Sequence, residues 1–84
     1  MEKILNTIQK IPEGYSEGKY KNQKYGVIKK SFNDNRSYKI YAKALGGNDF
    51  VSLNYYCTSS AGVLKPCEMP EEKVIDFLNH LELE

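Results

Sequence analysis

The sequence predicts an α+β domain, in which an antiparallel meander of four or five strands stands between an N-terminal and a C-terminal helix. Three observations support this fold class. Apolar residues recur with helical spacing near both ends, the middle is rich in Tyr, Val and Ile, and short polar clusters divide that middle into strand-length runs. Short links favour antiparallel pairing of successive strands. We expect both helices to pack on one face of the sheet and to leave the other face open.

The chain has 84 residues, enough for one modest core, so residues 1–84 are expected to form a single domain. No apolar run approaches the ~18 residues of a membrane-spanning helix. The N-terminus lacks the continuous apolar segment of a signal peptide. Two cysteines are too few for a disulfide scaffold. These features predict a soluble cytoplasmic protein that does not act at a membrane.

A first amphipathic helix of about ten residues is predicted at the N-terminus. Pro12 disfavours the helical conformation at Ile11, and Gly14 follows, so the helix should end there. Its apolar stripe comprises Met1, Ile4, Leu5, Ile8 and Ile11.

The middle of the chain divides into strand-length runs separated by turn-forming clusters. The runs are residues 17–21, 24–32, 37–45, 50–57 and 63–68, and the clusters are residues 22–23, 33–36, 46–49 and 58–62. Pro66 cannot donate a hydrogen bond to a neighbouring strand, which makes the fifth run an edge strand or a short bridge. In the second run the buried side stays open, because Tyr25 and Val27 compete with Ile28 and Phe32.

The third and fourth runs alternate clearly enough to assign their faces. In the third run Lys39, Tyr41 and Lys43 lie opposite the apolar side chains. In the fourth run Tyr56 lies opposite Val51 and its apolar neighbours. These outward residues would occupy the open face of the sheet.

A second helix is predicted to begin at Pro70, because proline suits the first helical position. Glu71 and Glu72 would complement the positive end of this helix. The apolar stripe comprises Val74, Ile75, Phe77, Leu78 and Leu81. The terminal Leu-Glu repeat at residues 81–84 fits a cloning remnant, so Leu83 and Glu84 carry no weight in the fold prediction.

The charges are strongly segregated along the chain, although the formal net charge is only +1. Residues 19–43 hold eight Lys or Arg and one acid, whereas residues 68–84 hold six acids and one base. Two interpretations stay open. The basic segment forms a face for an anionic partner, or it is neutralised internally by the acidic second helix.

The basic segment is interleaved with tyrosines, which suggests a non-enzymatic binding module for nucleic acid or for an acidic protein surface. Cations neutralise phosphates, and flat rings stack on exposed bases. The opposing interpretation is a solvated face whose lysines prevent association between sheets. We expect a monomer or a weak homodimer. The candidate binding residues are Lys21, Lys29, Lys39, Tyr41, Lys43 and Tyr56.

An alternative function is thiol-dependent redox chemistry through Cys67, which lies just before the predicted helix start. Partial positive charge there, with Lys65 nearby, favours the reactive thiolate. His80, the only histidine, would lie about 15 Å along the helix axis, too far to act as a base. Cys57 and Cys67 are expected to stay too far apart for a disulfide. Two cysteines and one histidine without a close pair predict no metal site, and no motif predicts a cofactor.

Three segments carry a family resemblance: YGV at residues 25–27, LGGNDFVSLN at residues 45–54 and LKPCEMP at residues 64–70. They resemble short bacterial proteins of unknown function, some of which are named peptide methionine sulfoxide reductase. The resemblance covers roughly residues 14–77 and implies a compact bacterial cytosolic domain. One class of reductase has a Gly-Cys-Phe-Trp motif, and another usually holds zinc in two Cys-x-x-Cys pairs. This chain has neither motif, so no catalytic role is transferred to it.

Overall fold

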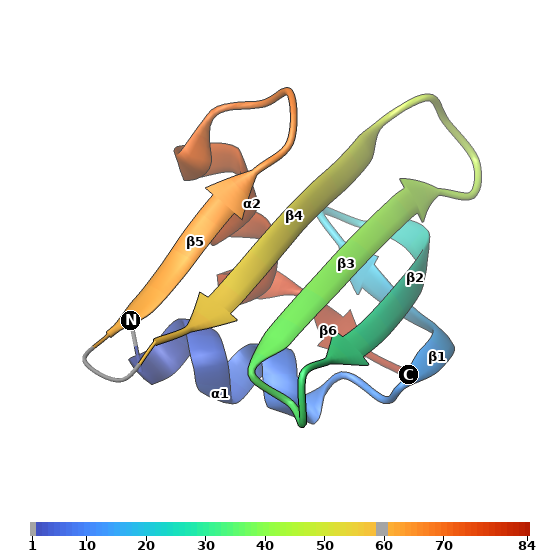
Figure 1. Ribbon diagram of the computed structural model, residues 1–84. Coiled ribbons are helices and arrows are strands. Elements are labelled where there is room, and N and C mark those ends of the chain that lie inside the picture. The colour runs from blue at the N-terminus through green and yellow to red at the C-terminus, as the bar shows by residue number, and fades with distance from the viewer. Residues whose placement is uncertain (1, 59–60) are drawn as a thin grey trace.

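The computed structural model describes residues 2–58 and 61–84, which form a six-stranded antiparallel sheet and two helices (Figure 1). The elements are α1 (Glu2–Lys10), β1 (Gly14–Tyr20), β2 (Gln23–Phe32), β3 (Ser37–Ala44), β4 (Phe50–Cys57), β5 (Gly62–Pro66), α2 (Glu71–His80) and β6 (Glu82–Leu83). The predicted α+β class and antiparallel sheet are confirmed. Met1, and residues 59–60 within the predicted turn at residues 58–62, lie outside the described residues.

The strand order is β5-β4-β3-β2-β1-β6, so the first five strands form the predicted meander and β5 is an edge strand. The prediction of four or five strands is wrong, because β6 pairs with β1 at the other edge. Gly18 of β1 faces Leu83, and a Cβ atom at Gly18 would lie 2.7 Å from the Glu82 carbonyl oxygen. A two-residue strand has no alternation that a sequence pattern could reveal, and Leu83, which carries no weight in the fold prediction, forms half of this strand.

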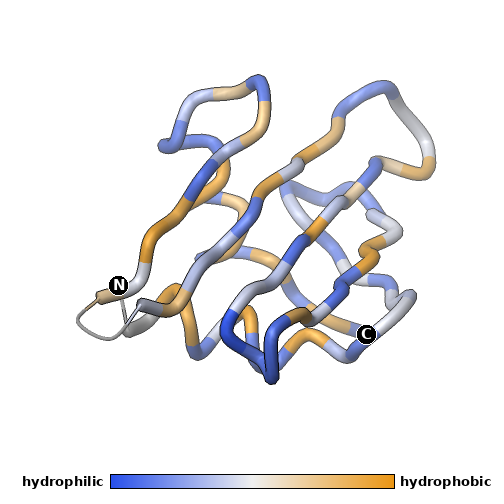
Figure 2. Tube along the Cα trace, viewed as in Figure 1, coloured by the Kyte–Doolittle hydropathy of each residue, from blue (hydrophilic) through white to orange (hydrophobic). Residues whose placement is uncertain are grey.

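Alternate side chains of the central strands form one buried core with the helices. Figure 2 shows hydrophobic and hydrophilic residues alternating along β3 and β4, and Figure 1 shows α1 and α2 behind the sheet. In β2, Tyr25 and Val27 are buried and Ile28 and Phe32 are exposed, which settles the open question of that strand. The core comprises Ile4, Ile8, Ile11, Tyr20, Tyr25, Val27, Tyr38, Ile40, Ala42, Ala44, Val51, Leu53, Tyr55, Leu64, Val74, Phe77 and Leu78.

Helix α2 is anchored to the sheet by Phe77, whose side chain is fully buried. Its ring contacts Tyr20 and Tyr25 edge-on, with centroid distances of 5.0 and 5.5 Å. Pro70 precedes the helix in an extended conformation, so α2 begins at Glu71 and not at Pro70 as predicted. Neither of the two described helices combines the length and the apolar character that crossing a bilayer would demand.

Candidate functional site

The face of the sheet opposite the core carries a row of cationic and amide side chains that crosses four strands. Lys30 of β2 pairs with Lys39 of β3, Lys39 pairs with Asn54 of β4, and Asn54 pairs with Lys65 of β5. Directly paired residues in a sheet point to the same side, so these four side chains form one line, here called the lysine row.

Apolar side chains flank the lysine row on both sides. The first ring row lies two residues along the strands from the lysine row; in it Ile28 pairs with Tyr41, and Tyr41 pairs with Ser52. The second ring row lies two residues from the lysine row in the opposite direction; in it Phe32 and Tyr56 both pair with Ser37. The apolar side chains of these two ring rows are 40–47% exposed, which is unusual for such large groups. Phe50 adds to the first ring row by stacking on Tyr41, at 6.1 Å between centroids and 28° between planes.

Between the lysine row and the first ring row the surface is hollowed into a depression of about 370 Å³. Its apolar lining comes from Ile28 and Tyr41, and its polar lining from Lys30, Lys39 and Ser52. The depression therefore combines an apolar ring with two ammonium groups within one small area.

The positive charges of this face differ in their ion pairing. Among the described residues, no ion pair involves Lys30, Lys39, Lys43 or Lys65. Lys24, at the side of the face near β6, behaves differently: its Nζ atom lies 3.1 Å from Glu17 and 3.4 Å from Glu84. These carboxylates, Glu17 foremost, raise the pKa of Lys24. The open face thus has a neutralised side at β1 and β6, and lysines outside ion pairs on β2, β3 and β5.

Four of the six residues predicted to bind a partner lie on this open face, namely Lys39, Tyr41, Lys43 and Tyr56. Lys21 does not. It occupies the turn between β1 and β2 with a positive φ of 51°, and its Nζ atom lies 3.8 Å from Asp76 of α2. It also lies 5.4 Å from the centroid of the Tyr20 ring, on the side of the molecule that carries α2.

The prediction that Lys29 belongs to the binding face is wrong. Lys29 is only 6% exposed and points into the core side of β2, in phase with Tyr25 and Val27. Its Nζ atom donates hydrogen bonds to the carbonyl oxygens of Ile8 (3.0 Å) and Ile11 (2.7 Å), at the C-terminal end of α1. The ammonium group adds to the Ile8 carbonyl, which also accepts from Ile11 N (3.2 Å), supplies a donor to the Ile11 carbonyl, and complements the negative end of the helix dipole.

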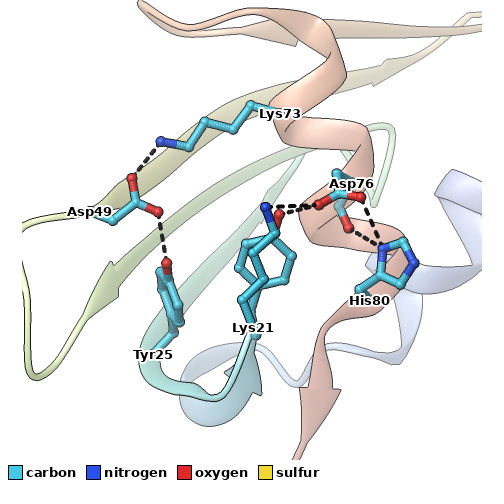
Figure 3. A network of polar contacts seen from close by, with 7 residues as sticks. Lys21, Tyr25, Asp49, Lys73, Asp76 and His80 are labelled. Atoms are coloured by element: carbon cyan, nitrogen blue, oxygen red, sulfur yellow. Dashed lines mark hydrogen bonds and ion pairs between the residues drawn. The ribbon is translucent and has the colours of Figure 1, made fainter.

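A second polar cluster fastens α2 to the sheet (Figure 3). Asp49, in the turn before β4, accepts hydrogen bonds from the Tyr25 hydroxyl (2.7 Å) and the Lys73 ammonium (2.5 Å). The pKa of Asp49 is lowered, chiefly by Lys73 and then by Tyr25. Burial raises the pKa of Tyr25 well above its usual value, and the hydrogen bond to Asp49 adds to this effect.

Asp76 of α2 is the second acid of the cluster. It accepts a hydrogen bond from the Tyr20 hydroxyl and lies 3.1 Å from His80 Nδ1. The Tyr20 hydrogen bond is the main cause of its lowered pKa. Burial and, next, the bond to Asp76 raise the pKa of Tyr20 to about 12. At neutral pH both tyrosines thus stay protonated and both acids stay ionised, an arrangement suited to anchoring the helix rather than to proton transfer.

This cluster lines a cleft of about 690 Å³ on the side of the molecule that carries α2, and sequence reasoning missed it. The spacing of Lys73, Asp76 and His80 at i, i+3 and i+7 places them on one face of α2 and could have drawn attention to them. No local sequence pattern relates these helix residues to Asp49 and Tyr25, which lie far away along the chain. Asp76, one of the acids of the second helix, is thereby engaged by Lys21 in a turn and by the core residue Tyr20, away from the open face.

The carboxylate of Asp49 should make stability depend on acid pH. Its folded pKa is lowered, so the stabilisation is present above the unfolded pKa near 3.9 and is lost as the pH falls through the lowered folded value. We expect Asp49→Asn to reduce the free energy of unfolding by about 1 kcal/mol at neutral pH, after allowance for partial exposure, and by much less near pH 3. Urea denaturation followed by circular dichroism at several pH values measures this. Asp34→Asn, in an exposed turn, is the control; an equal deficit for Asp49→Asn at both pH values would contradict the ion pair.

Both cysteines are free thiols, and both are of intermediate exposure. Cys67 Sγ lies 3.4 Å from Asn54 Nδ2, which can donate a hydrogen bond but cannot accept a proton as a base. His80 is engaged with Asp76 on α2. Within residues 2–58 and 61–84, no three His, Cys, Asp or Glu side chains gather in a way that could hold a metal ion.

Comparison of the chain with family models, with curated proteins and with solved structures finds no match. The resemblance to short bacterial proteins stays a prediction.

Proposed function

We propose that this protein is a small non-enzymatic binding module whose open sheet face takes an anionic partner. The observation that carries the proposal is the direct cross-strand pairing of Lys30 with Lys39, neither of which takes part in an ion pair with a described residue. Like charges placed directly opposite each other destabilise a sheet. A partner that brings negative charge to this pair would relieve the repulsion.

The position of these lysines argues against the simpler explanation that they only prevent association between sheets. Protective lysines are expected at sheet edges, where unpaired backbone groups are exposed. Lys30 and Lys39 instead lie on β2 and β3, which are both interior strands. In this proposal both helices cover one face of the sheet, and the opposite face is accessible to the partner. The proposal also includes a cytoplasmic location.

Removal of the central charges tests the proposal. We expect the double variant Lys30→Gln/Lys39→Gln to lose about ten-fold or more in affinity for a polyanion at about 50 mM salt. For a single-stranded oligonucleotide, the slope of log affinity against log salt should become shallower by roughly 1.4, since two phosphate contacts are lost. Fluorescence anisotropy with labelled oligothymidylate, labelled poly-glutamate and a labelled abasic phosphodiester gives both quantities.

Lys10→Gln/Lys21→Gln is the matched control, because it removes the same charge from positions outside the open face. It should leave affinity nearly unchanged. Thermal unfolding should show that Lys30→Gln/Lys39→Gln is no less stable than the parent, since a repulsive pair has been removed. If none of the three polyanions binds the parent protein, the proposed function is wrong.

The alternative of thiol chemistry at Cys67 gains no specific support, because its contact is an amide nitrogen. It stays a prediction. The rate of alkylation of Cys67 against pH tests it, and a reactivity profile like that of a free thiol, with midpoint near 8.5, would end it.

A further inference from the structure

We infer that the anionic partner of the open face is a single-stranded nucleic acid, with phosphates along the lysine row and unpaired bases on the flanking ring rows. This inference rests on the proposed function and names the chemical class of its ligand. It follows from the way charge and aromatic surface alternate on the sheet.

The three rows are spaced for a ligand that has charge and flat apolar groups in close succession. Residues two apart on a strand are about 7 Å apart, so each ring row lies about that distance from the lysine row. Tyr41 is on one side of Lys39, and Tyr56 is on the opposite side of the neighbouring Asn54. A sugar–phosphate backbone following the lysine row could therefore direct bases to either side.

The depression beside Lys39 supports a nucleobase rather than an acidic side chain as the group that it accepts. A carboxylate needs donors and gains nothing from an apolar ring. In this depression Ile28 and Tyr41 provide apolar contact while Lys30 and Lys39 supply charge. Stacking of Phe50 on Tyr41 extends the apolar surface beyond the depression. Sequence-tolerant recognition of single strands depends on such stacking together with a cationic track.

Two other occupants suit the face less well. A duplex keeps its base faces stacked inside and offers only base edges in its grooves, so the half-exposed rings of a sheet face could not stack on them. A second copy of this chain related by a two-fold axis would bring one lysine row against another. The repulsion of Lys30 and Lys39 would then increase and would not be relieved.

The test compares ligands that share charge but differ in bases. The unmodified protein is titrated with oligothymidylate of about twelve nucleotides, the abasic phosphodiester of equal length, poly-glutamate of equal charge, and a duplex. We expect oligothymidylate to bind about ten-fold or more tightly than the other three. Tyrosine fluorescence should be quenched on binding, because Tyr41 and Tyr56 lie where bases would stack.

Ring substitutions provide the second arm. Tyr41→Leu should weaken oligothymidylate binding about ten-fold and leave the abasic ligand unaffected, because leucine keeps the packing against Phe50 but cannot stack on a base. Phe50→Leu is the second variant and should act in the same direction. Tyr15 pairs with Ile28 and extends the first ring row onto β1, beside acidic Glu17, so Tyr15→Leu should weaken oligothymidylate binding less than Tyr41→Leu does. Lys10→Gln/Lys21→Gln, outside the open face, is the control and should leave the affinity nearly unchanged. Thermal unfolding verifies that each variant folds.

The outcomes separate this inference from the proposed function. Equal affinity for oligothymidylate and the abasic ligand, or tighter binding of poly-glutamate, overturns the nucleic-acid inference but keeps the anion-binding face. Tighter binding of the duplex overturns it as well. Absence of binding to every polyanion overturns both.

Discussion

Replacement of Phe77 by alanine is expected to lower the free energy of unfolding by about 4 kcal/mol, because it removes a fully buried ring through which α2 contacts the β1–β2 hairpin. Domains of this size are stable by only about 5–10 kcal/mol, so the variant should be largely unfolded at moderately raised temperature. Three effects contribute to this loss of stability: apolar surface is no longer buried, a cavity is left in the core, and the edge-to-face contacts with Tyr20 and Tyr25 disappear.

Urea denaturation of Phe77→Ala, followed by far-ultraviolet circular dichroism, measures this loss. Phe32→Ala is the matched control: it deletes the same group from the open face, where the ring is half-exposed, and should cost about 1 kcal/mol or less. Phe77→Leu should fall between the two, since most of the volume is kept. Similar losses for Phe77→Ala and Phe32→Ala would contradict the assignment of the two faces.

Replacement of Lys29 by methionine is expected to destabilise the protein by about 2 kcal/mol. The methionine keeps the apolar stem, but the carbonyl oxygens of Ile8 and Ile11 lose their donor at the end of α1. In the parent protein the buried ammonium has a desolvation cost, which Lys29→Met removes. Burial accordingly lowers the pKa of Lys29, an effect that nearby Glu13 partly opposes. The Ile8 carbonyl keeps its hydrogen bond from Ile11 N, so the expected loss comes from the two broken charge-assisted hydrogen bonds and the unpaired Ile11 carbonyl, which outweigh the relief of desolvation.

Lys30→Met is the control for Lys29→Met, since the adjacent residue points to the opposite side of the same strand. It should be neutral or slightly stabilising, because the repulsion with Lys39 disappears. The same pair separates stability from binding: Lys29→Met should leave polyanion affinity unchanged in the folded protein, whereas Lys30→Met should weaken it. If Lys29→Met proved as stable as Lys30→Met, the role of Lys29 at the end of α1 would be refuted.

The contrast between Lys29 and Lys30 shows why a basic segment does not define a basic face. Eight cations occur between residues 19 and 43, but pleating sends them in different directions. Lys29 is buried at the end of α1, Lys21 meets Asp76, and Lys24 meets Glu17 and Glu84. The cations that stay free of acids are those on which the proposed function depends.

Local patterns were sufficient for most of the architecture. The helical spacing near both ends, the turn clusters and the alternation in residues 37–45 and 50–57 predicted the α+β class, an antiparallel meander of four or five strands and the outward direction of Lys39, Tyr41, Lys43 and Tyr56. Pro66 indicated that its strand, β5, lies at an edge of the sheet or forms a short bridge. These features depend on backbone periods of two and about 3.6 residues, which are written into any short stretch of chain.

Contacts between distant segments were decided only by the tertiary structure. The buried side of β2, the pairing of β6 with β1 at Gly18, and the cluster of Asp49 with Lys73 join residues that no local period relates. Lys29 is the clearest case, because its direction follows from Val27 two residues earlier but its role depends on where α1 ends. A buried charge is tolerated only where a partner from elsewhere in the chain meets it, and sequence spacing does not contain that information.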